Sequence, residues 1–192
     1  MTLAPHRAIE HIIRVMRAPW TPLGSTSPYA RGTLTLREDR WRLPDGTERV
    51  YPVLHVGITV GVLPFIDDGH VLIIGQYRHL VRAVSWELPG GGARPGEEPL
   101  AAAQRELREE GGYRAAELVF LTRFLPSSAY LDEVAYCYAG FGLTADPLPA
   151  DDDELIEKRV VPIGEAIRMA LADEINESVS KTTLLQWAAS RA

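Results

Sequence analysis

The spacing of apolar positions changes along the chain between an alternating period and a period of three to four residues, and each change predicts a strand or a helix. Strand-like runs, alternating or continuously apolar, occupy residues 32–37, 40–43, 48–56, 57–64, 71–77, 118–125 and 133–141. The turn signatures Pro44-Asp45-Gly46 and Asp67-Asp68-Gly69 separate some of these runs. Residues 18–28, rich in Pro, Gly and Ser, are expected to be irregular.

Apolar residues at helical spacing predict helices. These cover residues 5–17, 99–110, 163–172 and 177–189. The second of them begins at Pro99, which suits a first helical position, and Gly111-Gly112 supplies its stop. Its apolar stripe, formed by Leu100, Ala103 and Leu107, is expected to face a core.

The last turns of this second helix place three carboxylates together. Glu106, Glu109 and Glu110 stand at i, i+3 and i+4, so their side chains project from adjoining parts of one face. Like charges at this spacing destabilise an exposed helix by roughly 0.2–0.5 kcal/mol per pair, so the face favours a bound cation. Hard oxygen ligands favour magnesium or manganese over zinc. The five histidines are scattered, which also speaks against a zinc site.

Composition narrows the class of protein. A length of 192 residues predicts one main domain with a small appendage, and a formal net charge of −6 does not suit a nucleic-acid backbone. We expect no membrane partner, because no apolar stretch is long and continuous enough to span a bilayer. Cys137 is the only cysteine, which excludes an internal disulfide and fits a reducing cytoplasm. It lies in an apolar run and is expected to be buried in a strand.

Gly91, Glu97 and the run Arg105-Glu106-Leu107-Arg108-Glu109-Glu110-Gly111-Gly112-Tyr113 together resemble a complete Nudix box, with five residues in the first gap and seven in the second. Tyr113 stands where the family usually has an aliphatic residue, which leaves the metal-binding positions unchanged. The resemblance implies an α/β/α sandwich built on a mixed sheet. It also implies an enzyme that hydrolyses a nucleoside diphosphate linked to another group.

The same resemblance assigns roles to the box residues. The three glutamates would hold Mg²⁺, with Mn²⁺ as an alternative, and the carbonyl of Gly90 would be a further metal ligand. Arg105 would orient the glutamates through charge-assisted hydrogen bonds. Glu97 would brace the loop against the helix.

Two segments before the box resemble one branch of the family. Gln76-Tyr77-Arg78 followed by Glu87-Leu88-Pro89-Gly90-Gly91 is similar to the ADP-ribose and nucleotide-sugar pyrophosphatases. By this resemblance Arg78 would bind substrate phosphate or sugar, and Glu87 would contact the terminal sugar or a water at the metal. The Ser-Pro-Gly signature of the ADP-ribose enzymes is imperfect here, since Ser128-Ala129 stands near the expected proline. Other nucleoside diphosphate sugars therefore stay open as substrates.

The N-terminal strands resemble the small antiparallel β appendage of the ADP-sugar enzymes. We expect residues 1–56 to form this appendage and residues 57–192 to form the hydrolase domain. In that branch a similar sheet helps to form a dimer and contributes to the substrate pocket, which implies a homodimer here. Tyr29 and Trp41 are candidates to stack on the base, with packing in a core or an interface as the alternative.

The acidic, Pro-containing segment at residues 146–157 is expected to be a loop, followed by a strand that contains Val160-Val161. Related pyrophosphatases carry a catalytic carboxylate at this point. Glu154 is the first candidate for the general base, followed by Asp152 and Glu157. A solvated loop without a catalytic role is the alternative.

The resulting hypothesis is an Mg²⁺-dependent hydrolase that cleaves a nucleoside diphosphate sugar into a nucleoside monophosphate and a sugar phosphate. GDP-mannose and dinucleoside polyphosphates are alternative substrates. A non-catalytic sensor of nucleotide sugars is an alternative of another class, although the intact box argues against it. A Nudix-fold isomerase of prenyl diphosphates is disfavoured because its cysteine setting is absent.

Overall fold

The computed structural model describes residues 20–31, 34–149 and 155–191. Contacts between residues divide the chain after His55 into an N-terminal unit and a larger second unit. The helix predicted at residues 5–17 lies outside the described residues.

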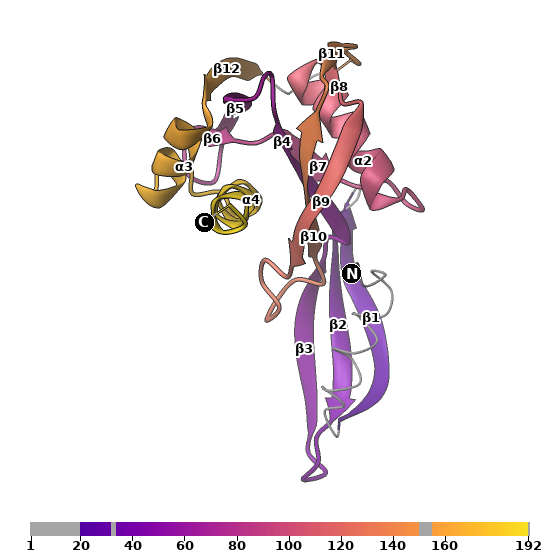
Figure 1. The fold of residues 1–192 in the computed structure, drawn as a ribbon. Helices are drawn as coiled ribbons and strands as arrows, with labels where there is room; N and C mark the ends of the chain where they lie inside the picture. The colour runs from indigo at the N-terminus through magenta and orange to yellow at the C-terminus, as the bar shows by residue number, and fades with distance from the viewer. Residues whose placement is uncertain (1–19, 32–33, 150–154, 192) are drawn as a thin grey trace. The chain divides into compact units, whose positions relative to one another are not determined.

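A three-stranded antiparallel sheet forms the described part of the N-terminal unit (Figure 1). Its strands are β1 (Thr21–Arg31), β2 (Leu34–Arg42) and β3 (Glu48–His55). Because β2 pairs along its length with β1 and β3, the two short strands predicted at residues 32–37 and 40–43 join into one. None of the described residues in these three strands is buried, so the sheet has no core of its own.

The prediction that residues 18–28 are irregular is wrong for most of that segment. Residues from Thr21 onward belong to β1 and pair with β2. Register shifts between Pro22 and Gly24 and between Thr26 and Tyr29 accommodate the residues that fit a regular ladder poorly. An edge position tolerates such residues, because only one side of the strand has to pair.

The second unit contains two larger sheets with the strand orders β7-β4-β10-β9 and β12-β5-β6, and a small pair β11-β8. The strands are β4 (Ile58–Pro64), β5 (His70–Arg78), β6 (Ala83–Glu87), β7 (Gly90–Gly92), β8 (Tyr113–Arg114), β9 (Glu117–Phe124), β10 (Val134–Phe141), β11 (Thr144–Ala145) and β12 (Ile156–Pro162). The helices are α2 (Pro99–Glu106), the π-helix η1 (Leu107–Gly111), α3 (Ile163–Leu171) and α4 (Ser178–Ala189). Strand β10 runs parallel to β4 and antiparallel to β9, so the sheet is mixed, as predicted.

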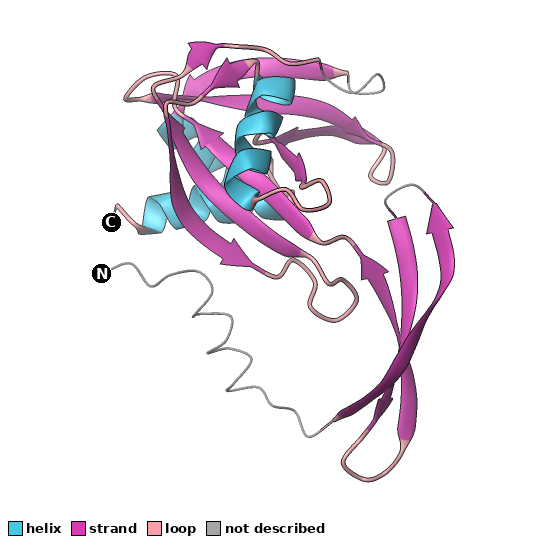
Figure 2. Cartoon of the chain, turned by 90° about the vertical axis from the view of Figure 1, so that its right-hand side faces the viewer, coloured by secondary structure: helices cyan, strands magenta, loops and turns pink. Residues whose placement is uncertain are grey.

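Alternate side chains of β4 enter two separate cores on opposite faces of the sheet. Val60 and Val62 pack with residues of α2 and η1, whereas Leu63 packs with residues of α3 and α4. Figure 1 shows α2 on one side of β4, β9 and β10 and the helices α3 and α4 on the other. The view turned by 90° shows one helix in front of the strands and others behind them (Figure 2). This arrangement confirms the predicted α/β fold with a helix layer on each face of the strands.

The helix that carries the box begins at Pro99, as predicted, but its last turn widens into the π-helix η1. Gly112 then ends it in the left-handed region with φ of 84°, where glycine is the residue that fits most readily. The predicted apolar stripe is wrong at Leu100, which is half exposed, whereas Ala103 and Leu107 are fully buried. Leu100 stands in the first turn, and Ala102 takes the buried position beside Ala103 instead.

Cys137 lies in β10 and is fully buried, as its apolar surroundings predict. Burial raises the pKa of its thiol to about 11. Across the described residues, none of the helices combines the length and apolar character needed to cross a membrane.

Candidate functional site

Two glycines bring the loop before the helix into close contact with its neighbours. A Cβ atom on Gly91 would lie 2.7 Å from Oε1 of Glu106, so only glycine lets this carboxylate approach the loop. A Cβ atom on Gly90 would collide with the carbonyl oxygen of Val60 in β4. Strands β7 and β4 and the glutamate-bearing helix therefore meet at Gly90 and Gly91.

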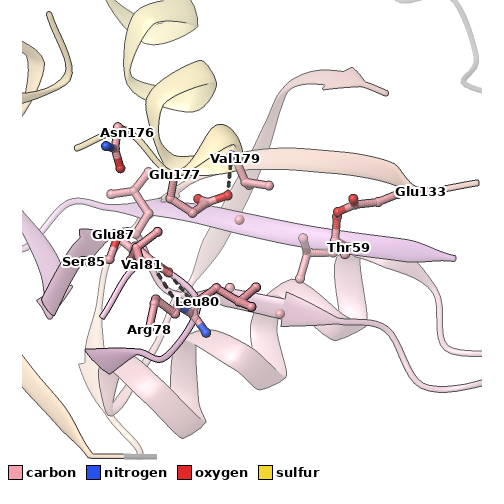
Figure 3. Close-up of a pocket in the computed structure, with 15 residues that line it drawn as sticks. Thr59, Arg78, Leu80, Val81, Ser85, Glu87, Glu133, Asn176, Glu177 and Val179 are labelled. Carbon is pink, nitrogen blue, oxygen red and sulfur yellow. Dashed lines mark hydrogen bonds and ion pairs between the residues drawn. The ribbon is translucent and has the colours of Figure 1, made fainter. Parts of the chain in front are cut away.

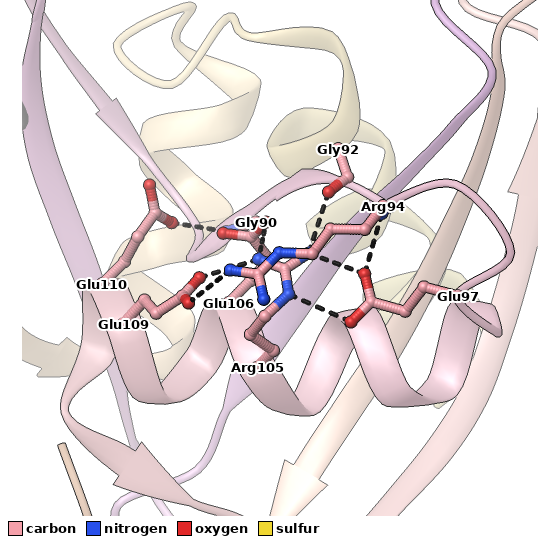
Figure 4. Close-up of polar contacts among 8 residues, drawn as sticks. All are labelled: Gly90, Gly92, Arg94, Glu97, Arg105, Glu106, Glu109 and Glu110. Atoms are coloured by element: carbon pink, nitrogen blue, oxygen red, sulfur yellow. Dashed lines mark hydrogen bonds and ion pairs between the residues drawn. The ribbon is translucent and has the colours of Figure 1, made fainter. Parts of the chain in front are cut away.

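Arg105 connects the carboxylates of the box, and all five of its N–H groups have an acceptor (Figure 4). Nε and Nη2 donate to the two oxygens of Glu97 at 3.0 and 2.9 Å. Nη1 donates to Oε1 of Glu106 and Oε2 of Glu109, both at 2.7 Å. Nη2 also donates to the Gly92 carbonyl at 2.9 Å. A planar, five-donor guanidinium suits this set of acceptors, and the ammonium of lysine would not.

These contacts change the acid–base properties of the pair. The bidentate bond to Glu97, followed by the bonds to Glu109 and Glu106, raises the pKa of Arg105 far above its ordinary range. The same guanidinium, helped by the backbone N–H of Arg94, lowers the pKa of Glu97 below its usual value of 4.5. Both groups therefore stay charged at neutral pH, and Glu97 ties the loop to the helix.

Glu110 contacts the loop directly rather than through Arg105. Its Oε2 accepts the backbone N–H of Gly90 at 2.7 Å, and the residue is only 3% exposed. Glu106 is also buried, at 9% exposed, whereas Glu109 additionally contacts the exposed guanidinium of Arg94 at 3.2 Å. The three glutamates thus lie along one edge of η1 and α2, beside Gly90 and Gly91.

The chemistry of this cluster fits a divalent cation. More carboxylates than guanidinium groups gather here, and partly buried surplus negative charge calls for a positive partner. The donors are hard oxygens, which suit Mg²⁺ or Mn²⁺. Within residues 20–31, 34–149 and 155–191, no group of three or more acidic, His or Cys side chains is arranged so that it could hold a metal ion. The carboxylates are instead held by Arg105 and by the Gly90 N–H.

A pocket of about 430 Å³ lies next to the two glycines (Figure 3). Most of its lining is apolar, with carboxylates and hydroxyls at intervals. Its residues come from β4, the β5–β6 hairpin, the Glu87–Gly91 segment, the start of β10 and the start of α4. They are Thr59, Val60, Gly61, Arg78, Leu80, Val81, Ser85, Glu87, Leu88, Gly90, Gly91, Glu133, Asn176, Glu177 and Val179.

Arg78 and Glu87 stand together in the pocket as an ion pair. Nε and Nη2 of Arg78 donate to the two oxygens of Glu87 at 2.9 and 2.5 Å. This bond, above all, raises the pKa of Arg78, and Glu110 and Glu177 contribute more weakly through their charges. Glu87 is buried, while the side chain of Arg78 is 45% exposed, so the guanidinium is the accessible member of the pair.

Figure 3 also labels residues that sequence patterns do not identify. Glu133 accepts a hydrogen bond from Oγ1 of Thr59 at 2.8 Å, away from the Arg78–Glu87 pair. Leu80 and Val81 in the β5–β6 hairpin line the pocket and are largely exposed. No local motif marks these residues: Thr59 and Glu133 are 74 positions apart, and Leu80 and Val81 carry no polar group that would single them out.

Of the remaining predicted site residues, two belong to the N-terminal unit, two lie outside the described residues and one lies in β12. Tyr29 is exposed in β1 and Trp41 is half-buried in β2, both in the N-terminal sheet. Asp152 and Glu154 lie outside the described residues. Glu157 is exposed, contacts Arg159 at 3.4 Å and pairs with Gly75 of β5.

The register of β12 decides where Glu157 points. Directly opposed residues of antiparallel strands share a face, and Val161 opposite Val71 enters the core below α3 and α4. Glu157 has the same parity as Val161, so it lies on that face. Lys158 lies on the other face, and a Cβ on Gly112 at the end of η1 would be 3.1 Å from its Nζ.

Comparisons with known proteins identify the family of the chain. The family model described as the NUDIX domain matches residues 55–183. An ADP-ribose pyrophosphatase of Mycobacterium tuberculosis is 32% identical over 164 residues, which cover 82% of this chain and 78% of that protein. An ADP-ribose pyrophosphatase of Bacillus subtilis is 29% identical over 138 residues, 71% of this chain and 75% of that protein. A methanol dehydrogenase activator of Bacillus methanolicus is 30% identical over 153 residues, 78% of this chain and 82% of that protein.

A solved structure shows the same fold. The crystal structure of an ADP compounds hydrolase superposes with a TM-score of 0.78 at 22% sequence identity, covering 90% of this chain and 96% of that chain.

Because the residues that match the family model span more than half of the sequence, the chain belongs to the Nudix family. It is a Nudix pyrophosphohydrolase, and the predicted resemblance to the ADP-ribose pyrophosphatase branch is confirmed. Nudix hydrolases generally use divalent metal ions.

Proposed function

We propose that this protein hydrolyses the pyrophosphate bond of a nucleoside diphosphate sugar similar to ADP-ribose, with Mg²⁺ as its metal ion. Water attacks one phosphorus, the bridging P–O bond breaks, and the products are a nucleoside monophosphate and a sugar phosphate. The observation that carries the proposal is the oriented carboxylate cluster directly beside a mostly apolar pocket. Relatives named as ADP-ribose pyrophosphatases support the choice of substrate class.

Glu106, Glu109, Glu110 and the carbonyl of Gly90 would hold the metal. When bound, the ion neutralises the pyrophosphate oxygens and increases the acidity of the attacking water. Arg105 fixes one oxygen each of Glu106 and Glu109, so these side chains are ordered in advance. Mn²⁺ has the same preference for oxygen ligands and would serve as an alternative.

Other residues of the chain handle the substrate and the proton. Arg78 would bind the diphosphate with its exposed guanidinium, and Glu87 would contact the sugar when that guanidinium moves to the phosphate. For the general base we propose a carboxylate of the acidic segment, with Glu154 as first choice and Asp152 as second. Glu157 is the weakest of the three predicted candidates. It lies on the face of β12 that carries the core residue Val161, whereas Lys158 lies on the opposite face, toward Gly112 at the end of η1.

The apolar pocket would receive one half of the substrate. Leu80 and Val81 offer exposed apolar surface, and the carboxylate of Glu133 offers acceptors for sugar hydroxyls. We further propose that Tyr29 and Trp41 stack on the base, as the resemblance implies. These assignments favour a substrate with a flat base and a hydroxyl-bearing sugar over an inorganic polyphosphate.

The test is product analysis after incubation of the purified protein with Mg²⁺ and a panel of substrates. The panel contains ADP-ribose, other ADP-sugars, GDP-mannose, diadenosine polyphosphates and nucleoside triphosphates. We expect a nucleoside monophosphate from a diphosphate sugar, and activity lower on the order of a hundredfold or more in Glu110→Gln. Glu165→Gln in α3 is the matched control, because Glu165 is exposed and pairs with Arg168.

Two outcomes would contradict the proposal. Full activity of Glu110→Gln would show that this carboxylate is not a metal ligand. Cleavage of GDP-mannose or of a dinucleoside polyphosphate in preference to every ADP-sugar would transfer the assignment to those substrates. If no compound were cleaved while a nucleotide sugar still raised the Tm, the protein would be a sensor.

We propose that the protein acts as a homodimer in the cytoplasm. A sheet without buried residues does not stabilise itself, and Trp20, Tyr29, Leu34, Val50 and Tyr51 expose apolar surface on it. A second copy of the chain, paired through this sheet, would cover such a surface. Light scattering after gel filtration gives the mass directly. A monomer at micromolar concentration would refute the dimer and would leave the proposed reaction unaffected.

A further inference from the structure

The C-terminal helix α4 makes a buried hydrogen bond with the segment that leads into the box. Oγ of Ser180 accepts the backbone N–H of Leu88 at 2.9 Å. The two residues are 92 positions apart, and Ser180 is only 1% exposed. A buried N–H group without an acceptor is costly, so this bond fixes where the backbone of Leu88 lies relative to α4.

A second hydrogen bond fixes the orientation of the Ser180 hydroxyl. The Ser180 hydroxyl donates to Oε2 of Glu177 at 2.7 Å, so its single proton is committed and a lone pair faces Leu88. Glu177 is held in turn, because its oxygens cap α4 by accepting the backbone N–H groups of Val179 and Ser180, each at 2.8 Å. Glu177 and Ser180 therefore form one rigid unit at the start of the helix.

Leu88 stands between two residues of the site. Glu87 bonds Arg78, and two positions beyond Leu88 the Gly90 N–H donates to Glu110 at 2.7 Å. Between them the carbonyl of Pro89 accepts the backbone N–H of Val62 in β4 at 2.9 Å. Glu87 and Gly90 also pair through their strands with Ile74 and Gly61, whereas the backbone N–H of Leu88 bonds α4.

The helix is also placed tightly enough to act as an anchor. A Cβ on Gly61 of β4 would lie 2.5 Å from Cγ1 of Val179, so α4 packs against the strand where that strand has no side chain. Thr183, one turn after Val179, is fully buried and bonds the Val179 carbonyl. The start of α4 has little room to shift.

We propose that Ser180 and Glu177 are positioning residues for the reaction: through the Leu88 N–H they set the carboxylate of Glu87 and the carbonyl of Gly90. This inference rests on the proposed function, in which Gly90 is a metal ligand. Ser180 itself touches neither substrate nor metal. The C-terminal helix thereby belongs to the functional site as well as to the core.

The test is Ser180→Ala, with two control variants. Ser178→Ala removes a neighbouring exposed hydroxyl that also bonds Glu177 but does not reach Leu88. Thr183→Ala removes a buried hydroxyl bond within α4 and reproduces a general loss of helix stability. Three quantities are measured for each: amide hydrogen exchange at Leu88 by NMR, the Kd for Mn²⁺ by calorimetry, and kcat and KM with the substrate.

For Ser180→Ala we expect Leu88 exchange to become about tenfold faster and the Mn²⁺ Kd to rise about tenfold. We also expect kcat to fall while KM changes little. Ser178→Ala should leave the Leu88 exchange and the Mn²⁺ Kd as in the wild type. Thr183→Ala should leave the Mn²⁺ Kd unchanged and should speed Leu88 exchange only as far as its loss of global stability accounts for. Glu177→Gln, which has one amide oxygen for four donors, should shift both quantities in the same direction by a smaller factor. It replaces Ser180→Ala as the test if that variant does not fold.

The failure of this inference and of the proposed function are separable. A wild-type protein that binds no Mn²⁺ would refute the proposed metal site. Normal wild-type binding, with Ser180→Ala matching Thr183→Ala in Mn²⁺ affinity and in Leu88 exchange, would refute the positioning role alone.

Discussion

Replacement of Arg105 by lysine keeps the positive charge but removes the planar set of five donors. Lysine offers three donors from one atom, so at least two of the five hydrogen bonds are lost. A hydrogen bond to a charged group contributes about 1.5–3 kcal/mol. The side chain of Arg105 is 12% exposed, which leaves water little access to replace the lost bonds. With some relaxation of the carboxylates, we expect Arg105→Lys to lower the free energy of unfolding by about 2–4 kcal/mol.

The chain offers a matched control in Arg168 of α3. This residue makes two bidentate contacts, to Glu165 and Glu174, whereas Arg105 makes one, and the side chain of Arg168 is 50% exposed. Exposed ion pairs contribute about 0–1 kcal/mol, so Arg168→Lys should cost that little. Urea unfolding, followed by circular dichroism with a common m-value, measures both variants. Equal losses in the two variants would refute the idea that burial and the five-donor geometry give Arg105 its importance.

Four further outcomes are expected. Gly61→Ala should destabilise the protein by about 1–3 kcal/mol through the clash with Val179. The double variant with Val179→Ala should recover most of this loss, as measured by thermal unfolding. Equal destabilisation of the single and double variants would contradict the contact. Cys137, whose pKa burial raises to about 11, should resist a thiol reagent at pH 8 in the native protein and react fully in guanidinium chloride, and rapid native labelling would show that it is accessible. The guanidinium of Arg105 lowers the pKa of Glu97 below 4.5, so the stability that this group contributes is fully present above about pH 4.5 and is lost as the pH falls through the folded-state pKa. The Tm of the wild type should therefore exceed that of Glu97→Gln by less below that pH. A constant difference in Tm down to pH 3 would contradict this pKa shift. Glu133→Gln should raise KM for a diphosphate sugar about tenfold with little change in kcat, whereas an unchanged KM would place the sugar elsewhere.

Local patterns in the sequence are enough to predict the elements that depend on neighbouring residues. The helix start at Pro99, its end at Gly112 and the burial of Cys137 all follow from spacing and composition. Local patterns do not predict the structure correctly where contacts with residues distant in the sequence decide whether a segment pairs or a side chain is buried. The Pro- and Gly-containing β1 is a strand because β2 pairs with it, and Leu100 is exposed although its position fits an apolar stripe.

The residues of the candidate site also fall into two groups: those that local spacing brings together and those that only the fold brings together. Glu106, Glu109 and Glu110 share one edge because helical spacing brings residues three and four apart together, and any helix with these letters would do so. Sequence alone therefore determined the family and the carboxylate face. The Glu133–Thr59 pair and the bond from Leu88 to Ser180 join residues 74 and 92 positions apart. Only the tertiary structure decided these contacts, because the packing of distant strands and helices sets such proximities and no local period records them.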